Sequence, residues 1–125
     1  MSLNPLGRPA TTPVVTVIAG AVPFAVVFDH HGNLAVAEAG TNAVETFRVG
    51  SDGTLTSLGS VGTGQAATCW IVRDGSLLFT SNAGSADHSG IRIGAHESLT
   101  LLGQTATDAG TVEAAVSDGG RFLYV

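Results

Sequence analysis

Short apolar runs separated by turn residues recur along the chain at a spacing of 44 residues. The segment FRVG at 47–50 is matched by IRIG at 91–94. The segment VVF at 26–28 is matched by WIV at 70–72 and again by AAV at 114–116. Because the matches share one frame, they predict a repeat architecture.

Each repeat holds four short strands bounded by glycine and aspartate turns. In the first repeat we predict strands at 24–28, 33–37, 44–49 and 55–61. In the second they are predicted at 68–72, 77–81, 89–93 and 99–104. Near-continuous apolar runs such as CWIV indicate strands that are buried on both faces. No stretch of ten residues has helical periodicity.

A unit of about 40–45 residues with four strands is typical of a β-propeller blade. We therefore predict an all-β fold, a β-propeller fragment of four-stranded antiparallel blades repeating every 44 residues. Residues 1–13 are expected to be a flexible segment and residues 14–125 a partial propeller. The last strand of one blade falls at 14–17, blades fall at about 22–61 and 66–104, and a further blade starts at 111–125. The chain would hold roughly two and a half blades of the 4–8 that close a ring.

The composition excludes several classes of protein. Hydrophobic residues make up 44% of the 125 residues, which excludes intrinsic disorder. The net charge is −5, and all five basic residues are arginines. An acidic chain with five scattered cations neutralises few phosphates, so we expect no nucleic-acid partner. The absence of lysine excludes a Schiff-base or P-loop lysine.

No membrane partner is expected either. The most apolar stretch, residues 13–28, is too short for a spanning helix and is interrupted by Gly20 and Pro23. The repeat explains this stretch better than a signal peptide does. The sequence leaves the localisation open, with the cytoplasm slightly favoured over secretion. The single cysteine, Cys69, cannot form an internal disulfide.

Several motifs resemble the lactonase-type seven-bladed β-propeller family, which includes 6-phosphogluconolactonase and carboxymuconate-lactonising enzyme. They are DGTLT at 52–56, CWIV at 69–72, DGSLLFTSNAGS at 74–85 and SDGGRFLYV at 117–125. The resemblance covers about residues 14–125. These motifs belong to the blade scaffold, so they are specific for the fold and weak for the reaction. The chain departs from the family at residues 66–67, where two alanines replace a frequent proline. The resemblance implies lactone chemistry for a complete ring, and no catalytic residue of the family can be matched.

One carboxylate interrupts an apolar strand. The first strand of each blade lines the channel of a propeller, and the repeat places Ala25, Cys69 and Glu113 at one register. A carboxylate there must be hydrated, paired or raised in pKa, which suits a channel acid or base. The alternative is a glutamate that is simply exposed at a strand end. Arg73 and Arg48 are candidate binding partners, because guanidinium groups bind carboxylates in a bidentate manner.

The other motifs favour structural roles. The segment GTGQAA at 62–67 fits a dinucleotide-binding pattern, but a predicted strand follows it where a helix is required, so no cofactor is expected. We expect His30, His31, His88 and His96 to be solvated loop residues, and no metal site. Cys69 beside Trp70 is expected to pack rather than to act as a nucleophile.

Two functions remain open. In the first, the intact protein hydrolyses or forms a small acidic lactone, and this chain alone is inactive. In the second, it is a non-catalytic propeller scaffold that binds a small ligand or a protein partner. A small anionic or lactone ligand is expected in the first case. The predicted open strand edge at 122–125 favours self-association, unless these blades belong to a longer chain.

Overall fold

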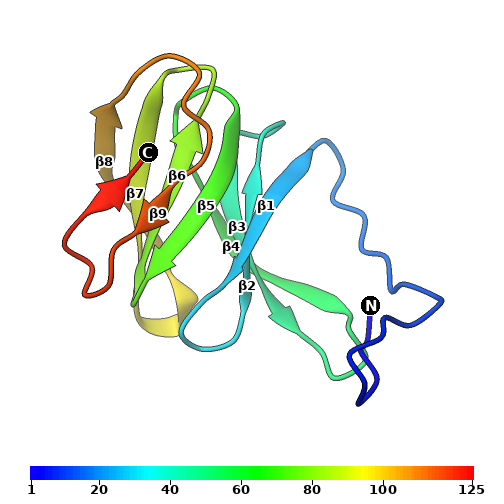
Figure 1. Ribbon diagram of the computed structural model, residues 1–125. Helices are drawn as coiled ribbons and strands as arrows, with labels where there is room; N and C mark the ends of the chain where they lie inside the picture. Colours follow the sequence, from blue (N-terminus) through cyan, green and yellow to red (C-terminus); the bar gives the residue numbers. More distant parts are fainter.

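The computed structural model describes all 125 residues as three antiparallel sheets (Figure 1). The first sheet, blade 1, consists of β1 (Pro23–Phe28), β2 (Leu34–Glu38), β3 (Ala43–Val49) and β4 (Leu55–Gly62). The second, blade 2, consists of β5 (Thr68–Asp74), β6 (Leu77–Asn82), β7 (Asp87–Ile93) and β8 (Leu99–Ala106). The third is the hairpin of β9 (Ala115–Val116) and β10 (Leu123–Tyr124). A 3-10 turn, η1 (Ala95–Glu97), lies between β7 and β8.

The prediction of an all-β fold with repeating four-stranded blades is confirmed. Strands in both blades follow the chain order without a crossover. Side chains fix the turns between them. The Asp29 carboxylate accepts hydrogen bonds from the backbone N–H groups of His31 and Asn33, each at 2.8 Å. Such aspartate turns are why the DG and DHHG segments end strands. The structure contains no helix long and apolar enough to cross a membrane.

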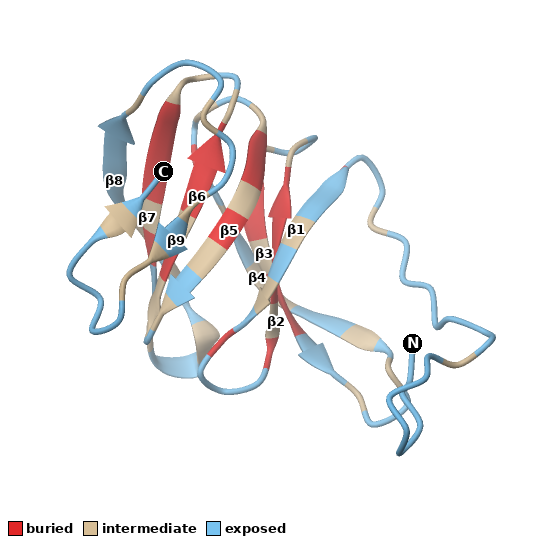
Figure 2. Cartoon of the chain, in the orientation of Figure 1, coloured by how far each residue is buried: buried red, intermediate tan, exposed pale blue.

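The hydrophobic core lies between the two blades. Its fully or nearly fully buried members are Ala35, Ala37 and Val44 of blade 1 and Ile71, Leu78, Ile91 and Ile93 of blade 2. Figure 2 shows this as buried strand segments in the middle of the molecule, with exposed strands on either side. A four-stranded sheet with apolar residues on both faces is buried only where another sheet covers it.

The innermost strands of the two blades differ by one residue from the 44-residue repeat, because the turn that follows is shorter in blade 2. Five residues separate the paired Phe28 and Leu34, whereas four separate the paired Arg73 and Leu78. Ala25 lies opposite Ala37, whereas Trp70 lies opposite Ser81. Ala37 and Ser81 are 44 residues apart, but Ala25 and Trp70 are 45 apart. The expected common register of Ala25 and Cys69 is therefore wrong. Since side chains alternate faces along a strand, a shift of one residue turns the side chain to the other face.

The two ends of the chain lie outside the four-stranded sheets. Residues 14–17, expected as the last strand of a preceding blade, are extended but pair with no strand. A strand needs a neighbouring ladder, and this chain supplies none at that position. Residues 1–13 contain a turn in which the Asn4 side chain accepts hydrogen bonds from the N–H groups of Leu6 and Arg8. Figure 1 shows this segment running away from blade 1.

Each blade also presents an outer face that no complete sheet covers. On β1, the side chains of Phe24, Val26 and Phe28 are 57–59% exposed. Beyond blade 2, the strongly exposed apolar residues include Leu102 and Tyr124. Apolar surface of this extent on a small protein marks an interaction surface.

We therefore predict that the chain self-associates through these faces. Sedimentation equilibrium should give a mass that is a multiple of 12.5 kDa. Val26→Glu should shift the equilibrium toward the monomer, because it places a charge on the outer face of blade 1. Ser51→Glu, in the exposed β3–β4 turn and outside both faces, should leave the mass unchanged. A monomeric wild-type chain at every protein concentration would refute the prediction.

Candidate functional site

The two ends of the blades differ in charge. We call the end with the β1–β2, β3–β4, β5–β6, β7–β8 and β9–β10 turns the arginine end, and the opposite end the network end. Every arginine except Arg8 lies at or next to a turn of the arginine end: Arg48, Arg73, Arg92 and Arg121. The network end has no arginine and carries Glu38, Glu45, Asp87, Asp108 and Glu113. An anionic ligand therefore finds its cations at the arginine end alone.

A buried hydrogen-bond network joins the blades at the network end. The hydroxyl groups of Thr63, at the end of blade 1, and Thr68, on β5, are 2.9 Å apart. Thr68 also donates to the Asn82 side-chain oxygen at 2.7 Å. The amide nitrogen of Asn82 in turn donates to Asp87 at 2.6 Å and to Ser89 at 2.8 Å. All five side chains are buried, so this network satisfies polar groups that would otherwise destabilise the interface.

On its other face, blade 2 carries a serine–histidine pair. The Ser81 hydroxyl and His88 Nε2 are 2.8 Å apart, on neighbouring positions of β6 and β7. His88 is only 4% exposed, and its Nδ1 atom has no hydrogen-bond partner. Burial lowers the pKa of His88 below its usual value, and the nearby Asp87 carboxylate only partly opposes this. The expectation that His88 is a solvated loop residue is wrong, because it lies on a buried strand.

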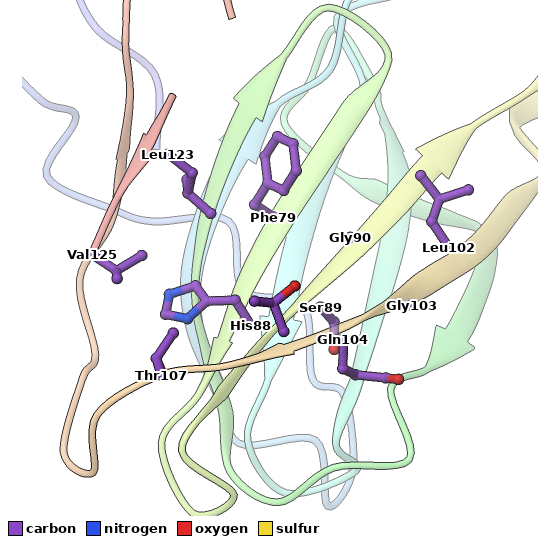
Figure 3. Close-up of a pocket in the computed structure, with 11 residues that line it drawn as sticks. Phe79, His88, Ser89, Gly90, Leu102, Gly103, Gln104, Thr107, Leu123 and Val125 are labelled. Atoms are coloured by element: carbon purple, nitrogen blue, oxygen red, sulfur yellow. The ribbon is translucent and has the colours of Figure 1, made fainter. Parts of the chain in front are cut away.

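A cavity of about 590 Å³ lies between this face of blade 2 and β10 (Figure 3). His88, Ser89 and Thr107 are among its polar residues, and Phe79, Leu102 and Leu123 form apolar walls. The Thr107 hydroxyl is buried and, like His88 Nδ1, has no partner. Figure 3 shows the Thr107 and His88 side chains at one end of the cavity. The cavity therefore combines apolar walls with two polar atoms that lack partners.

A second buried polar group, on blade 1, is the Glu38 carboxyl. The Thr41 hydroxyl donates to its Oε2 atom at 2.5 Å, while its Oε1 atom has no partner. Burial raises the pKa of Glu38. The Thr41 hydrogen bond opposes this rise, and the neighbouring Glu45 carboxyl adds to it. Glu45 itself accepts a hydrogen bond from Ser57. At neutral pH, ionised Glu38 would be a buried charge without a cationic partner.

The structure does not bring the three predicted site residues together. Glu113 is exposed just before β9, outside a strand, and lines a shallow pocket with Tyr124 and Val125. Arg73 is exposed at the far end of β5, where it donates to the Gly75 carbonyl at 3.1 Å. The two residues therefore lie at opposite ends of the blades, with Glu113 at the network end.

Arg48 is no closer to Glu113. It is exposed near the end of β3, opposite Thr56 of β4, and so lies at the arginine end in the outer half of blade 1. Cys69 is buried, and its thiol lies 3.7 Å from the Ser81 carbonyl oxygen. Groups of three or more potential metal ligands are absent from the structure.

The repeat itself contained the signal for the pair that sequence reasoning missed. Counting back 44 residues from Ser81 and His88 gives Ala37 and Val44, which are completely buried in the core. Ser81 and His88 are polar at positions where blade 1 is apolar, which indicates that this face of blade 2 has a role other than packing. The sequence prediction began the strand at Ser89, two residues too late, and so left His88 in a loop.

Comparison with known proteins establishes the fold. No model of a known protein family matches the chain, and no curated protein sequence is significantly similar to it. Three solved structures, each 20% identical to it, share its architecture. A functionally unknown protein from Desulfotomaculum acetoxidans has a TM-score of 0.76 over 88% of this chain.

The other two structures agree. A protein from Lactobacillus plantarum gives a TM-score of 0.72 over 82% of this chain. A "putative 6-phosphogluconolactonase" from Bacteroides fragilis gives 0.73 over 87%. The chain spans about a third of the length of each, 33–36%. The chain therefore shares the antiparallel blade fold of these three structures.

Buried His88 should make stability sensitive to acid. Its folded-state pKa lies below the usual 6.5, so below about pH 6.5 the unfolded chain binds a proton that the folded chain does not. The free energy of unfolding should then fall as the pH decreases from 6.5 through the folded-state pKa. His88→Gln keeps a hydrogen-bonding group beside Ser81 but does not titrate. We expect this variant to lose less stability than the wild type between pH 7.5 and 5 in urea denaturation, by about 1 kcal/mol.

The control is His30→Gln, which changes an exposed histidine and should keep the wild-type pH dependence. Identical pH dependence in the wild type and the His88 variant would contradict the assignment.

Glu38→Gln should stabilise the chain at neutral pH. The folded state disfavours the ionised carboxyl, so stability is lost as the pH rises from 4.5 through the raised pKa of Glu38. Removing the ionisable group should add about 1 kcal/mol, or ~4 °C in the melting temperature, at pH 7 and little at pH 4. Glu113→Gln, at an exposed position, should change neither value. Calorimetry at both pH values tests this, and destabilisation at pH 7 would count against it.

Proposed function

We propose that these blades are part of a lactonase-like propeller protein that hydrolyses or forms a small acidic lactone. The observation that carries the proposal is the overlap of 87% of the chain with the "putative 6-phosphogluconolactonase" from Bacteroides fragilis, at a TM-score of 0.73. The motifs DGSLLFTSNAGS and SDGGRFLYV support the same family. Because the overlap covers only 33% of that protein, the proposal concerns the intact ring.

We propose further that the chain on its own does not turn over a lactone. Hydrolysis of a lactone needs an acid or base next to groups that stabilise the developing oxyanion. Glu113 is exposed at the network end, while Arg73 and Arg48 lie at the arginine end. In an intact ring, blades outside this chain would supply the missing cations beside Glu113.

The second candidate is a non-catalytic scaffold that binds a small ligand or a protein partner. It is favoured by the position of the buried polar groups, which join blade to blade at Thr63, Thr68 and Asn82 and do not line an open channel. Propeller folds host both catalytic and binding functions, so the fold alone does not choose between them.

Release of acid from a lactone separates these alternatives. The purified chain should open 6-phosphogluconolactone and uncharged gluconolactone no faster than buffer does. The longest polypeptide that the host makes from this reading frame should accelerate hydrolysis of the phosphorylated lactone, because an intact ring would provide the cations that bind the phosphate group. In that polypeptide, Glu113→Gln should lower kcat about a hundredfold if Glu113 is the acid or base.

Glu97→Gln, at the arginine end, is the matched control and should keep the wild-type rate. Turnover by the 125-residue chain alone would refute its inactivity. If the longer polypeptide accelerates the hydrolysis of neither lactone, the enzyme proposal is refuted and the scaffold proposal remains.

A further inference from the structure

The cavity beyond blade 2 lies where the repeat would place an apolar interface. In blade 1, the positions equivalent to Ser81 and His88 are Ala37 and Val44, whose side chains are fully buried against blade 2. Blade 2 instead presents a hydroxyl and an imidazole to a cavity of about 590 Å³. This volume lies within the ~300–1,000 Å³ that small-molecule sites occupy.

A second departure from the repeat leaves Thr107 without a partner. The backbone N–H of Thr63 donates a hydrogen bond to the Asn42 carbonyl at 2.9 Å. The equivalent bond in blade 2, with both partners 44 residues further along the chain, runs from the N–H of Thr107 to the Ala86 carbonyl, also at 2.9 Å. The Thr63 hydroxyl is satisfied by the Asn42 carbonyl and by Thr68.

At the next interface, the residue 44 positions after Thr68 is Val112, which offers no side-chain hydrogen bond. The Thr107 hydroxyl therefore remains buried and unpartnered, as does the Nδ1 atom of His88. Leaving two such atoms unsatisfied destabilises the folded chain, and a bound polar group would recover that cost.

We propose that this cavity binds a small uncharged molecule with a hydroxyl group next to an apolar portion. The hydroxyl is held by His88 and Thr107. A hydroxyl both donates and accepts, so it can pair with Nδ1 in either tautomer and with the threonine hydroxyl. The apolar portion lies against Phe79, Leu102 and Leu123. The site requires no turnover and does not depend on the proposed lactone chemistry.

The charges around the cavity select against an anionic ligand. Two of its polar residues lie near the network end, where Asp87 adjoins His88 and Asp108 adjoins Thr107 in the sequence. No arginine or lysine lines it. An anion would therefore enter a region of negative formal charge without a counter-ion, at an unfavourable electrostatic cost.

The proposal can be tested by NMR on the complete chain labelled at the histidine Cε1 atoms. The probe is phenyl β-D-glucopyranoside, a neutral molecule with hydroxyl groups beside an aromatic ring. The charged counterpart is phenyl β-D-glucuronide, which carries a carboxylate in place of the hydroxymethyl group. The His88 signal is identified by its loss in His88→Gln. We expect the glucoside to shift this signal saturably, with Kd at least about tenfold lower than that of the glucuronide.

Matched variants separate the site from a general effect on folding. Thr107→Val should weaken glucoside binding about tenfold, and Thr107→Ser, which keeps the hydroxyl, should restore it. Thr100→Val makes the same change on an exposed part of β8 outside the cavity and should leave Kd unchanged.

Three results would overturn the proposal. The first is a His88 signal that the glucoside does not move. The second is equal or tighter binding of the glucuronide. The third is a His88 signal that shifts with protein concentration but not with the probe, which would show that a second copy of the chain fills the cavity.

Discussion

Each blade depends on having another sheet against its face. Four short strands with apolar residues on both sides cannot be buried by their own hairpins, so the core forms only where blade 1 meets blade 2. The residues Ala35 and Val44 are completely buried because Leu78 and Ile91 cover them. The polar network of Thr63, Thr68 and Asn82 closes the same interface at one end. The cavity and the exposed outer faces follow from this constraint, because there no complete blade lies opposite.

The candidate site is where the repeating interface is interrupted. Ala37 and Val44 fill the first interface, and Ser81 and His88 take their place in the second. An apolar pair needs only a covering sheet, whereas a serine–histidine pair also needs a partner for the remaining imidazole nitrogen. Thr107 has the same requirement. The chemistry of this face therefore arises from local substitutions in a shared scaffold, without any change in strand order.

The sequence predicted the fold well because strand boundaries in a repeat are set locally by glycine and aspartate turns. The eight blade strands lie within two residues of their predicted positions at every boundary. The placement of side chains was harder to predict, because the turn between β5 and β6 is one residue shorter than the turn between β1 and β2, which shifts β5 by one residue against the repeat and reverses the face. His88 was placed in a loop, although its alignment with buried Val44 indicated a strand. For Glu113, Arg73 and Arg48, residue type alone suggested a site, although the predicted strand ends already put the two arginines beside turns and Glu113 at the start of a blade.

The separation of arginines from the buried network gives the molecule an electrical polarity along its strands. The formal charge at the arginine end is −1, from four arginines and five carboxylates. At the network end it is −5, from five carboxylates alone. A positively charged surface, such as an anion-exchange matrix or an amine-coated sensor chip, would therefore capture the chain by its network end. Immobilised molecules would share one orientation, with the arginine turns facing the solution and the buried hydrogen-bond network turned toward the support.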